Sequence, residues 1–82
     1  MRNITKNQTK RLLRKVQRCQ FSDNGRHKIG IQLYEGDEGC KIWFTCVGEL
    51  DGKHYWAECY DWRTYEENLE VINKFIEIFS NN

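Results

Sequence analysis

The sequence predicts an α+β fold in the order α-β-β-β-α, in which a three-stranded antiparallel meander has two helices packed on one face. Apolar residues recur at helical spacing near both ends of the chain, whereas in the middle they alternate with polar residues. Two turn sequences, Gly36-Asp37-Glu38-Gly39 and Asp51-Gly52, divide the alternating part into three strands. A chain of 82 residues has room for one core, so we expect a single domain over residues 1–82.

The first helix is expected over about residues 5–20. Thr5 and Gln8 have the spacing of a capping box, which satisfies free backbone N–H groups at a helix start. One side of this helix is apolar and carries Leu12, Leu13, Val16 and Cys19. The opposite side carries six cations, which we call the basic stripe: Lys6, Lys10, Arg11, Arg14, Lys15 and Arg18.

Three strands are expected over about residues 28–35, 40–48 and 53–60. A two-residue hairpin at Asp51-Gly52 places Phe44 opposite Cys59 and Trp43 opposite Tyr60. If Glu35 pairs with Cys40 across the other turn, Ile31 lies opposite Phe44.

This register gives the sheet two different faces. The predicted core face carries Ile29, Ile31, Leu33, Cys40, Ile42, Phe44, Cys46, Tyr55, Ala57 and Cys59. The second face carries four aromatic residues, Tyr34, Trp43, Trp56 and Tyr60. Such a face is either covered by a helix or used to hold a partner, because Trp and Tyr are enriched at binding hot spots.

The second helix is expected over about residues 64–79. Thr64 and Glu67 form its capping box. Its apolar side consists of Tyr65, Leu69, Ile72, Phe75, Ile76 and Phe79. Its other side is acidic, with Glu66, Glu70 and Glu77, and Glu70 is spaced to pair with Lys74.

The net charge of +1 conceals a strong separation of charge along the chain. Residues 1–28 contain nine Lys or Arg and one Asp, a net charge of +8, whereas residues 29–82 contain four Lys or Arg and eleven Asp or Glu, a net charge of −7. Such asymmetry indicates an electrostatic partner for one part of the chain. The alternative is that the two parts neutralise each other within the fold or between two chains.

The N-terminal residues are polar and basic, so we expect no secretory signal and a cytoplasmic location. No apolar run is long enough for a transmembrane helix, and we therefore expect no membrane partner.

No motif for catalysis or metal binding is recognisable. Cys40 and Cys46 are separated by about 20 Å along one strand, which is too far to bind one zinc ion. His54 and Cys59 point to opposite faces of a strand and cannot form a nucleophile–base pair. We therefore expect no enzymatic activity, no metal, no cofactor and no small-molecule substrate, and we interpret the cysteines as buried, reduced thiols.

The α-β-β-β-α order resembles that of the double-stranded-RNA-binding domain. The residues that bind RNA in that family have no counterpart here, because Thr64-Tyr65-Glu66-Glu67 replaces the basic cluster at the start of the last helix. The histidine-bearing loop between the first two strands is also absent. In general style the chain is similar to small phage-encoded inhibitors of host nucleoproteins, including anti-CRISPR proteins, which are compact, strongly charged and without catalytic residues.

The leading hypothesis is a non-enzymatic binding module that occupies a surface of nucleic acid or of a nucleic-acid-handling complex through the basic stripe. The first alternative is a protein-interaction or homodimerisation module that uses the aromatic sheet face. The second alternative is an acidic mimic of nucleic acid that uses the second helix.

Overall fold

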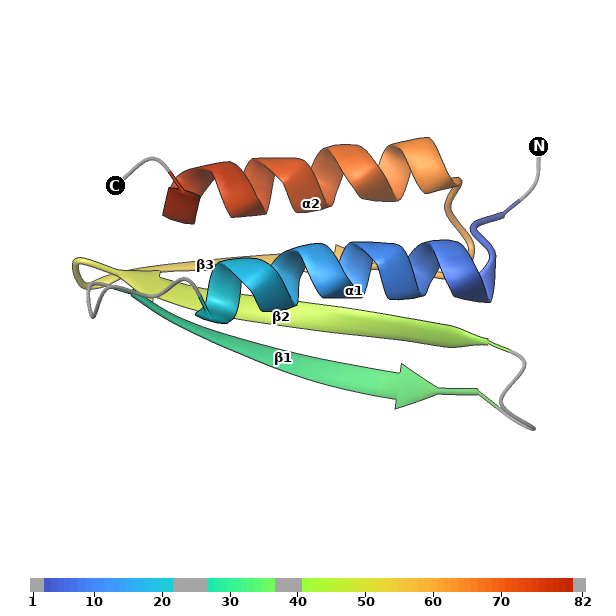
Figure 1. Cartoon of the computed structure of the whole chain (residues 1–82), viewed down its shortest axis with the longest axis horizontal. Helices are drawn as coiled ribbons and strands as arrows, with labels where there is room; N and C mark the ends of the chain where they lie inside the picture. The colour runs from blue at the N-terminus through green and yellow to red at the C-terminus, as the bar shows by residue number, and fades with distance from the viewer. Residues whose placement is uncertain (1–2, 22–26, 37–40, 81–82) are drawn as a thin grey trace.

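The structure, a computed structural model, describes residues 3–21, 27–36 and 41–80. The elements follow the predicted order α-β-β-β-α (Figure 1). They are α1 (Lys6–Phe21), β1 (His27–Glu35), β2 (Ile42–Leu50), β3 (Lys53–Cys59) and α2 (Tyr65–Ser80).

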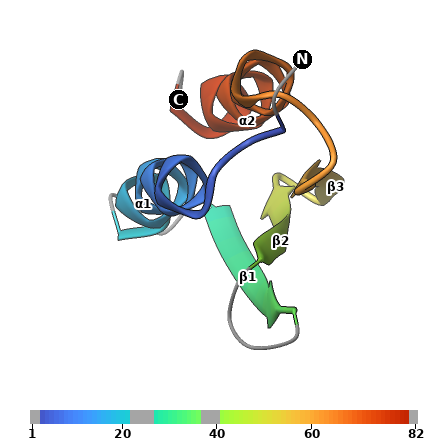
Figure 2. The ribbon, with the colours of Figure 1, turned by 90° about the vertical axis from the view of Figure 1, so that its right-hand side faces the viewer.

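Both helices lie on the same face of one antiparallel sheet with the strand order β1-β2-β3 (Figures 1 and 2). They lie side by side and run in the same direction (Figure 1). The α1 helix contacts β1, β2 and α2, and α2 contacts β3. Neither helix covers the other face of the sheet, which we call the open face (Figure 2).

Both predicted capping boxes are confirmed. The Thr5 N–H donates to Gln8 Oε1 at 2.9 Å, and the Gln8 N–H donates to Thr5 Oγ1 at 3.2 Å. At the start of α2, the Thr64 N–H donates to Glu67 Oε1 at 3.1 Å and the Glu67 N–H donates to Thr64 Oγ1 at 3.2 Å. The Thr64 hydroxyl also donates to Glu67 Oε1, at 3.0 Å, and the two bonds that this oxygen accepts from Thr64 hold the pKa of the Glu67 carboxyl below its usual value. Each helix therefore starts within one residue of its expected position.

The predicted register between β2 and β3 is confirmed, with Phe44 opposite Cys59. The connecting turn uses Asp51 and Gly52 at positive φ angles of 51° and 83°, as a two-residue hairpin requires. The next residues beyond this ladder would be Trp43 and Tyr60, but β3 ends at Cys59.

The predicted register between β1 and β2 is wrong by two residues. Leu33, rather than Ile31, lies opposite Phe44. The Gly36 N–H donates to the Lys41 carbonyl at 2.8 Å, so the turn closes one residue later along the chain than a Glu35–Cys40 pair would allow. The second strand accordingly covers residues 42–50 instead of 40–48. A shift of two residues leaves every side chain on its predicted face, because the side-chain period of a strand is two.

The core lies between the helices and the sheet. Its buried cluster consists of Ile4, Leu12, Val16, Cys19, Ile29, Phe44, Cys46, Leu50, Ala57, Cys59, Ile72, Phe75 and Phe79. The placement of Leu33 in the core is wrong, because 46% of this residue is exposed near the end of β1. Cys40, also predicted on the core face, lies outside the described residues.

Asn68 is a buried polar residue that the apolar pattern of α2 does not predict. Its Oδ1 accepts the Tyr60 N–H at 3.0 Å. Its Nδ2 donates to the carbonyls of Tyr60 at 2.9 Å, Thr64 at 3.1 Å and Arg63 at 3.5 Å. The Arg63 carbonyl also accepts the Ile4 N–H at 2.8 Å. One side chain therefore fixes the connection between β3 and α2, to which the segment before α1 is also attached.

We expect Asn68→Ala to lower the free energy of unfolding by about 3 kcal/mol, because it leaves buried backbone groups without hydrogen-bond partners. Asn73→Ala is the matched control, since Asn73 is exposed on the same helix, and its effect should stay within about 0.5 kcal/mol. Urea unfolding measures both values. Equal stability of the two variants would show that Asn68 does not hold the connection.

Glycine 48 faces the core, and a Cβ added there would overlap the Phe79 ring. At Gly30, on the open face, an added Cβ would meet only Val47 Cγ2, at 3.5 Å. We expect Gly48→Ala to destabilise the fold by about 1–3 kcal/mol through overpacking. Gly30→Ala should be neutral or slightly stabilising in the same thermal unfolding experiment. The reverse order would contradict the packing of the Phe79 ring against Gly48.

Candidate functional site

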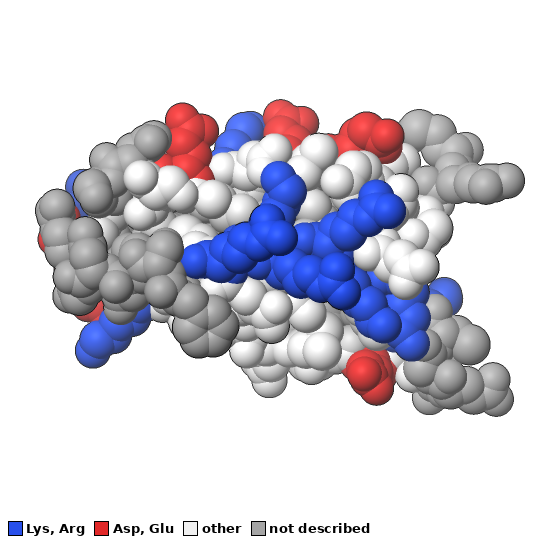
Figure 3. All heavy atoms as spheres, in the orientation of Figure 1, with Lys and Arg blue, Asp and Glu red and all other residues white. Residues whose placement is uncertain are grey.

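All six residues of the basic stripe are exposed on α1. In the space-filling view, Lys and Arg side chains form a band over this helix (Figure 3). The opposite side of α1 buries Leu12 and Val16 completely. The packing of this apolar side fixes the rotation of the helix and directs the stripe to solvent.

Most of the stripe has no partner within the described residues. The described ion pairs are Lys41–Asp61 at 3.8 Å and Lys74–Glu70 at 3.4 Å, and neither involves α1. Among the residues that the structure describes, no carboxylate pairs with the five stripe cations Lys10, Arg11, Arg14, Lys15 and Arg18. The positive charge of this part of the stripe is therefore not neutralised by a described side chain of the same chain.

The acidic side of α2 lies next to the basic stripe but remains separate from it. Glu66, Glu70 and Glu77 are all exposed. Figure 3 shows acidic side chains along the outer edge of the molecule, with an uncharged zone between them and the basic band. Because Glu70 pairs with Lys74, as the spacing predicted, the acidic side is interrupted by a cation. It is a less uniform surface than the stripe.

The residues of the open face form rows across the three strands. From one end of the sheet to the other, the rows are Lys28–Glu49–His54, Gly30–Val47–Trp56, Gln32–Thr45–Glu58 and Tyr34–Trp43. The first row is charged or ionisable, and the second is apolar. A polar row separates Trp56 from the pair Tyr34–Trp43.

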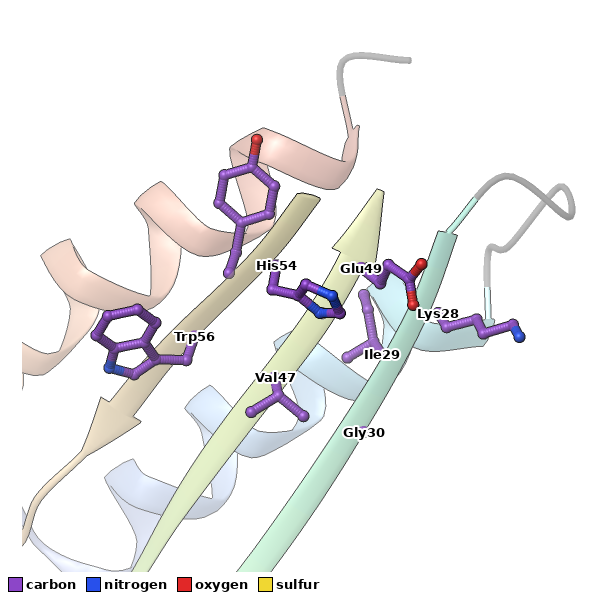
Figure 4. Close-up of a pocket in the computed structure, with 9 residues that line it drawn as sticks. Lys28, Ile29, Gly30, Val47, Glu49, His54 and Trp56 are labelled. Carbon is purple, nitrogen blue, oxygen red and sulfur yellow. The ribbon is translucent and has the colours of Figure 1, made fainter. Parts of the chain in front are cut away.

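Trp56 is the most exposed large apolar residue of the described chain, at 72%. Its cross-strand neighbour Val47 is 56% exposed, and Gly30 has no side chain to cover the next position. Together they border a shallow hollow of about 630 Å³. Figure 4 shows His54 and Glu49 along one side of this hollow and Trp56 at its end. The hollow offers an apolar contact with polar groups on one rim.

The other predicted aromatic residues contact each other or a neighbour. Tyr34 and Trp43 stack with ring centroids 5.8 Å apart and an interplanar angle of 10°. Tyr60 stacks on Trp62 at 4.1 Å, and the Arg63 guanidinium lies 4.6 Å from the centroid of the Tyr60 ring. The structure thus brings Tyr34 and Trp43 together and leaves Trp56 apart from them.

Trp62 is an exposed aromatic residue that the sequence analysis missed, and it is 61% exposed. It belongs to the segment Asp61-Trp62-Arg63, which follows β3 and precedes the capping box of α2. The sequence does contain a sign of this exposure. Trp62 lies outside the alternating pattern of the strands and outside the helical pattern that follows, so no core position accounts for it.

The two candidate surfaces lie on opposite sides of the sheet, because α1 packs on the face that the aromatic residues do not use (Figure 2). A flat partner can therefore contact the basic stripe or the open face, but not both. Phosphate binding on α1 and base stacking on Trp56 would be separate events.

The described thiols are buried. Cys19, Cys46 and Cys59 are free cysteines in the core. Burial raises the pKa of Cys46 to about 12 and that of Cys59 to about 11, so both stay protonated near neutral pH. Within the described residues, no three His, Cys, Asp or Glu side chains are grouped to hold a metal ion. None of the described helices is long and apolar enough to cross a membrane.

No protein-family model, curated protein or solved structure matches this chain. The assignment of function therefore depends on the geometry of its two exposed surfaces.

Proposed function

We propose that the protein is a non-enzymatic binding module whose basic stripe contacts the phosphate backbone of nucleic acid, either free or within a nucleic-acid-handling complex. The observation that supports this most strongly is the side-by-side exposure of six cations on α1, five of them without a described carboxylate partner. Lysine and arginine at such sites release counterions from nucleic acid when they bind phosphate.

The dimensions of the stripe fit this role. Lys6 and Arg18 are separated by about 18 Å along the helix axis, at 1.5 Å per residue. One strand of a duplex carries about five phosphate charges over that length, at one charge per 3.4 Å. Six cations therefore face a comparable line of phosphates.

The seating of α1 favours contact with the backbone over reading of bases. A recognition helix inserts deeply into the major groove, where its side chains reach the base edges. Here α1 lies on the sheet through Leu12 and Val16 and has α2 beside it, so it is held in the surface of the fold and only its outer side is free (Figure 1). We therefore expect binding with little sequence preference, in which the protein acts by occupying a surface.

This mode of action is the one expected of a small inhibitor of a host nucleoprotein. Small phage-encoded inhibitors of this kind, including anti-CRISPR proteins, are compact, strongly charged and without catalytic residues. The similarity of this chain to them in those respects supports the more specific proposal that it inhibits a nucleoprotein.

The exposure of Trp56 favours a second candidate function, that of a protein-interaction module which uses the open face. Trp56 and Val47 would both contact the surface of a protein partner, since they are cross-strand neighbours and both are mostly exposed. Buried tryptophan anchors of this kind contribute strongly to protein interfaces.

The double variant Arg14→Gln/Arg18→Gln tests the leading proposal. Fluorescence anisotropy with a generic DNA duplex and a generic single-stranded RNA measures the slope of log K against log salt concentration. Full engagement of the stripe predicts a slope of about −5 with the duplex, and the double variant should reduce its magnitude by about 1.8. The affinity at low salt should fall at least about tenfold.

Lys53→Gln/Lys74→Gln is the matched control. It changes the net charge equally, but on β3 and α2, and should leave the slope nearly unchanged. An equal loss in both double variants would mean that only overall charge matters. Absence of salt-sensitive binding by the unmodified protein would overturn the proposal and favour a protein partner.

A further inference from the structure

The β1 strand is an edge of the sheet whose outward hydrogen-bonding groups can be identified. The bond from the Gly36 N–H to the Lys41 carbonyl marks Gly36–Lys41 as a hydrogen-bonded pair of the antiparallel hairpin. Such pairs alternate with pairs whose backbone groups point away from the partner strand. The even-numbered residues of β1 therefore bond to β2, and the odd-numbered residues direct their N–H and C=O groups outward.

A second contact agrees with this alternation. Gln20, near the end of α1, donates through Nε2 to the Ile29 carbonyl at 2.7 Å, as expected if that carbonyl points away from β2. Gln20 thus satisfies the outward carbonyl of Ile29. Within the described residues, the outward backbone groups of Ile31, Leu33 and Glu35 have no corresponding side-chain partner.

Apolar exposure increases along the same stretch. Ile29 is 8% exposed, Ile31 is half-buried and Leu33 is 46% exposed, although all three lie on the helix side of the sheet. Figure 1 shows that β1 diverges from α1 toward the C-terminal end of the strand, and Leu33 lies in this last part of β1. Unpaired backbone and exposed apolar surface therefore coincide at residues 31–35.

We propose that residues 31–35 pair antiparallel with the same residues of a second copy, so that two three-stranded sheets join into one of six strands. The two-fold axis passes beside Leu33. Leu33 then faces the partner's Leu33, and Ile31 faces the partner's Glu35. Each of these pairs uses outward groups on both strands, so the odd-numbered residues exchange about six backbone hydrogen bonds.

The side chains favour a second copy as the occupant. The pairing covers Leu33 with the partner's Leu33 on the helix side. On the open side, Gln32 faces the partner's Tyr34, and no two like charges are opposed. The arrangement is isologous and therefore closes as a dimer. The other edge differs on its helix side, because α2 packs against β3 and buries Ala57 and Cys59, whereas Leu33 of β1 is left 46% exposed.

The contact is small, at five residues from each chain, whereas standard interfaces use about 20–30 residues a side. We therefore expect a weak dimer that forms at high protein concentration. It also places two basic stripes on the same side of the joined sheet, so salt should strengthen dimerisation by screening their repulsion. Salt has the opposite effect on phosphate binding, which separates the two processes experimentally.

Amide NMR spectra test the pairing residue by residue, without nucleic acid and at high salt. Between about 50 µM and about 1 mM protein, a range suited to weak association, the amides of Ile31, Leu33 and Glu35 should shift and gain protection from hydrogen exchange. Those of Gln32 and Tyr34 should change little, because they already bond to β2. Unchanged odd-numbered amides, or a monomer at every concentration, would overturn the proposal.

Sedimentation of two matched variants distinguishes edge pairing from stacking of open faces. Leu33→Lys should weaken the dimer by about 10- to 100-fold, because it removes apolar burial twice per dimer and opposes two charges. Val47→Lys introduces the same charge at a similarly exposed position on the open face and should leave dimerisation intact. Loss of the dimer in Val47→Lys alone would contradict edge pairing and assign the interface to the open face.

Discussion

The packing of the apolar side of α1 against the sheet determines which surfaces of this protein are exposed. Leu12 and Val16 have no exposed surface, and they seat the helix on β1 and β2 beside α2. Because these residues fix the rotation of α1, the basic stripe can only face solvent. Two helices on one face also use most of the apolar residues, so the open face remains uncovered. Both candidate binding surfaces are thus consequences of how one helix is seated.

The parallel arrangement of the helices depends on the connection that Asn68 holds. Its hydrogen bonds to Tyr60 and Thr64 set how β3 passes into α2, and the Ile4–Arg63 bond attaches the segment before α1 to the same connection. The two helices start at this end of the sheet and run side by side, with the cations and acids on outward-facing sides (Figures 1 and 3). The charge separation of the sequence consequently becomes a separation in space, rather than an internal set of ion pairs among the described residues.

Features set by local periodicity could be predicted from the sequence. These include both helices with their capping boxes, the face of each strand residue, and the basic stripe, which requires only that Leu12 and Val16 point inward. The β1–β2 register could not be predicted, because closing the turn at Glu35–Cys40 or at Gly36–Lys41 gives the same faces. The exposure of Leu33 depends on how far β1 diverges from α1. The role of Asn68 depends on backbone groups that a pattern of apolar residues does not reveal.

The central claim, that the stripe is the surface which contacts phosphate, is tested most directly by lysine acetylation footprinting with mass spectrometry, with and without a generic DNA duplex. Lys6, Lys10 and Lys15 should become protected when the duplex binds, whereas Lys53 and Lys74 on other surfaces of the same molecule should react at unchanged rates. Because all five lysines are exposed in the free protein, each reports on contact rather than on folding. Unchanged reactivity of the α1 lysines in the presence of bound duplex would contradict the account.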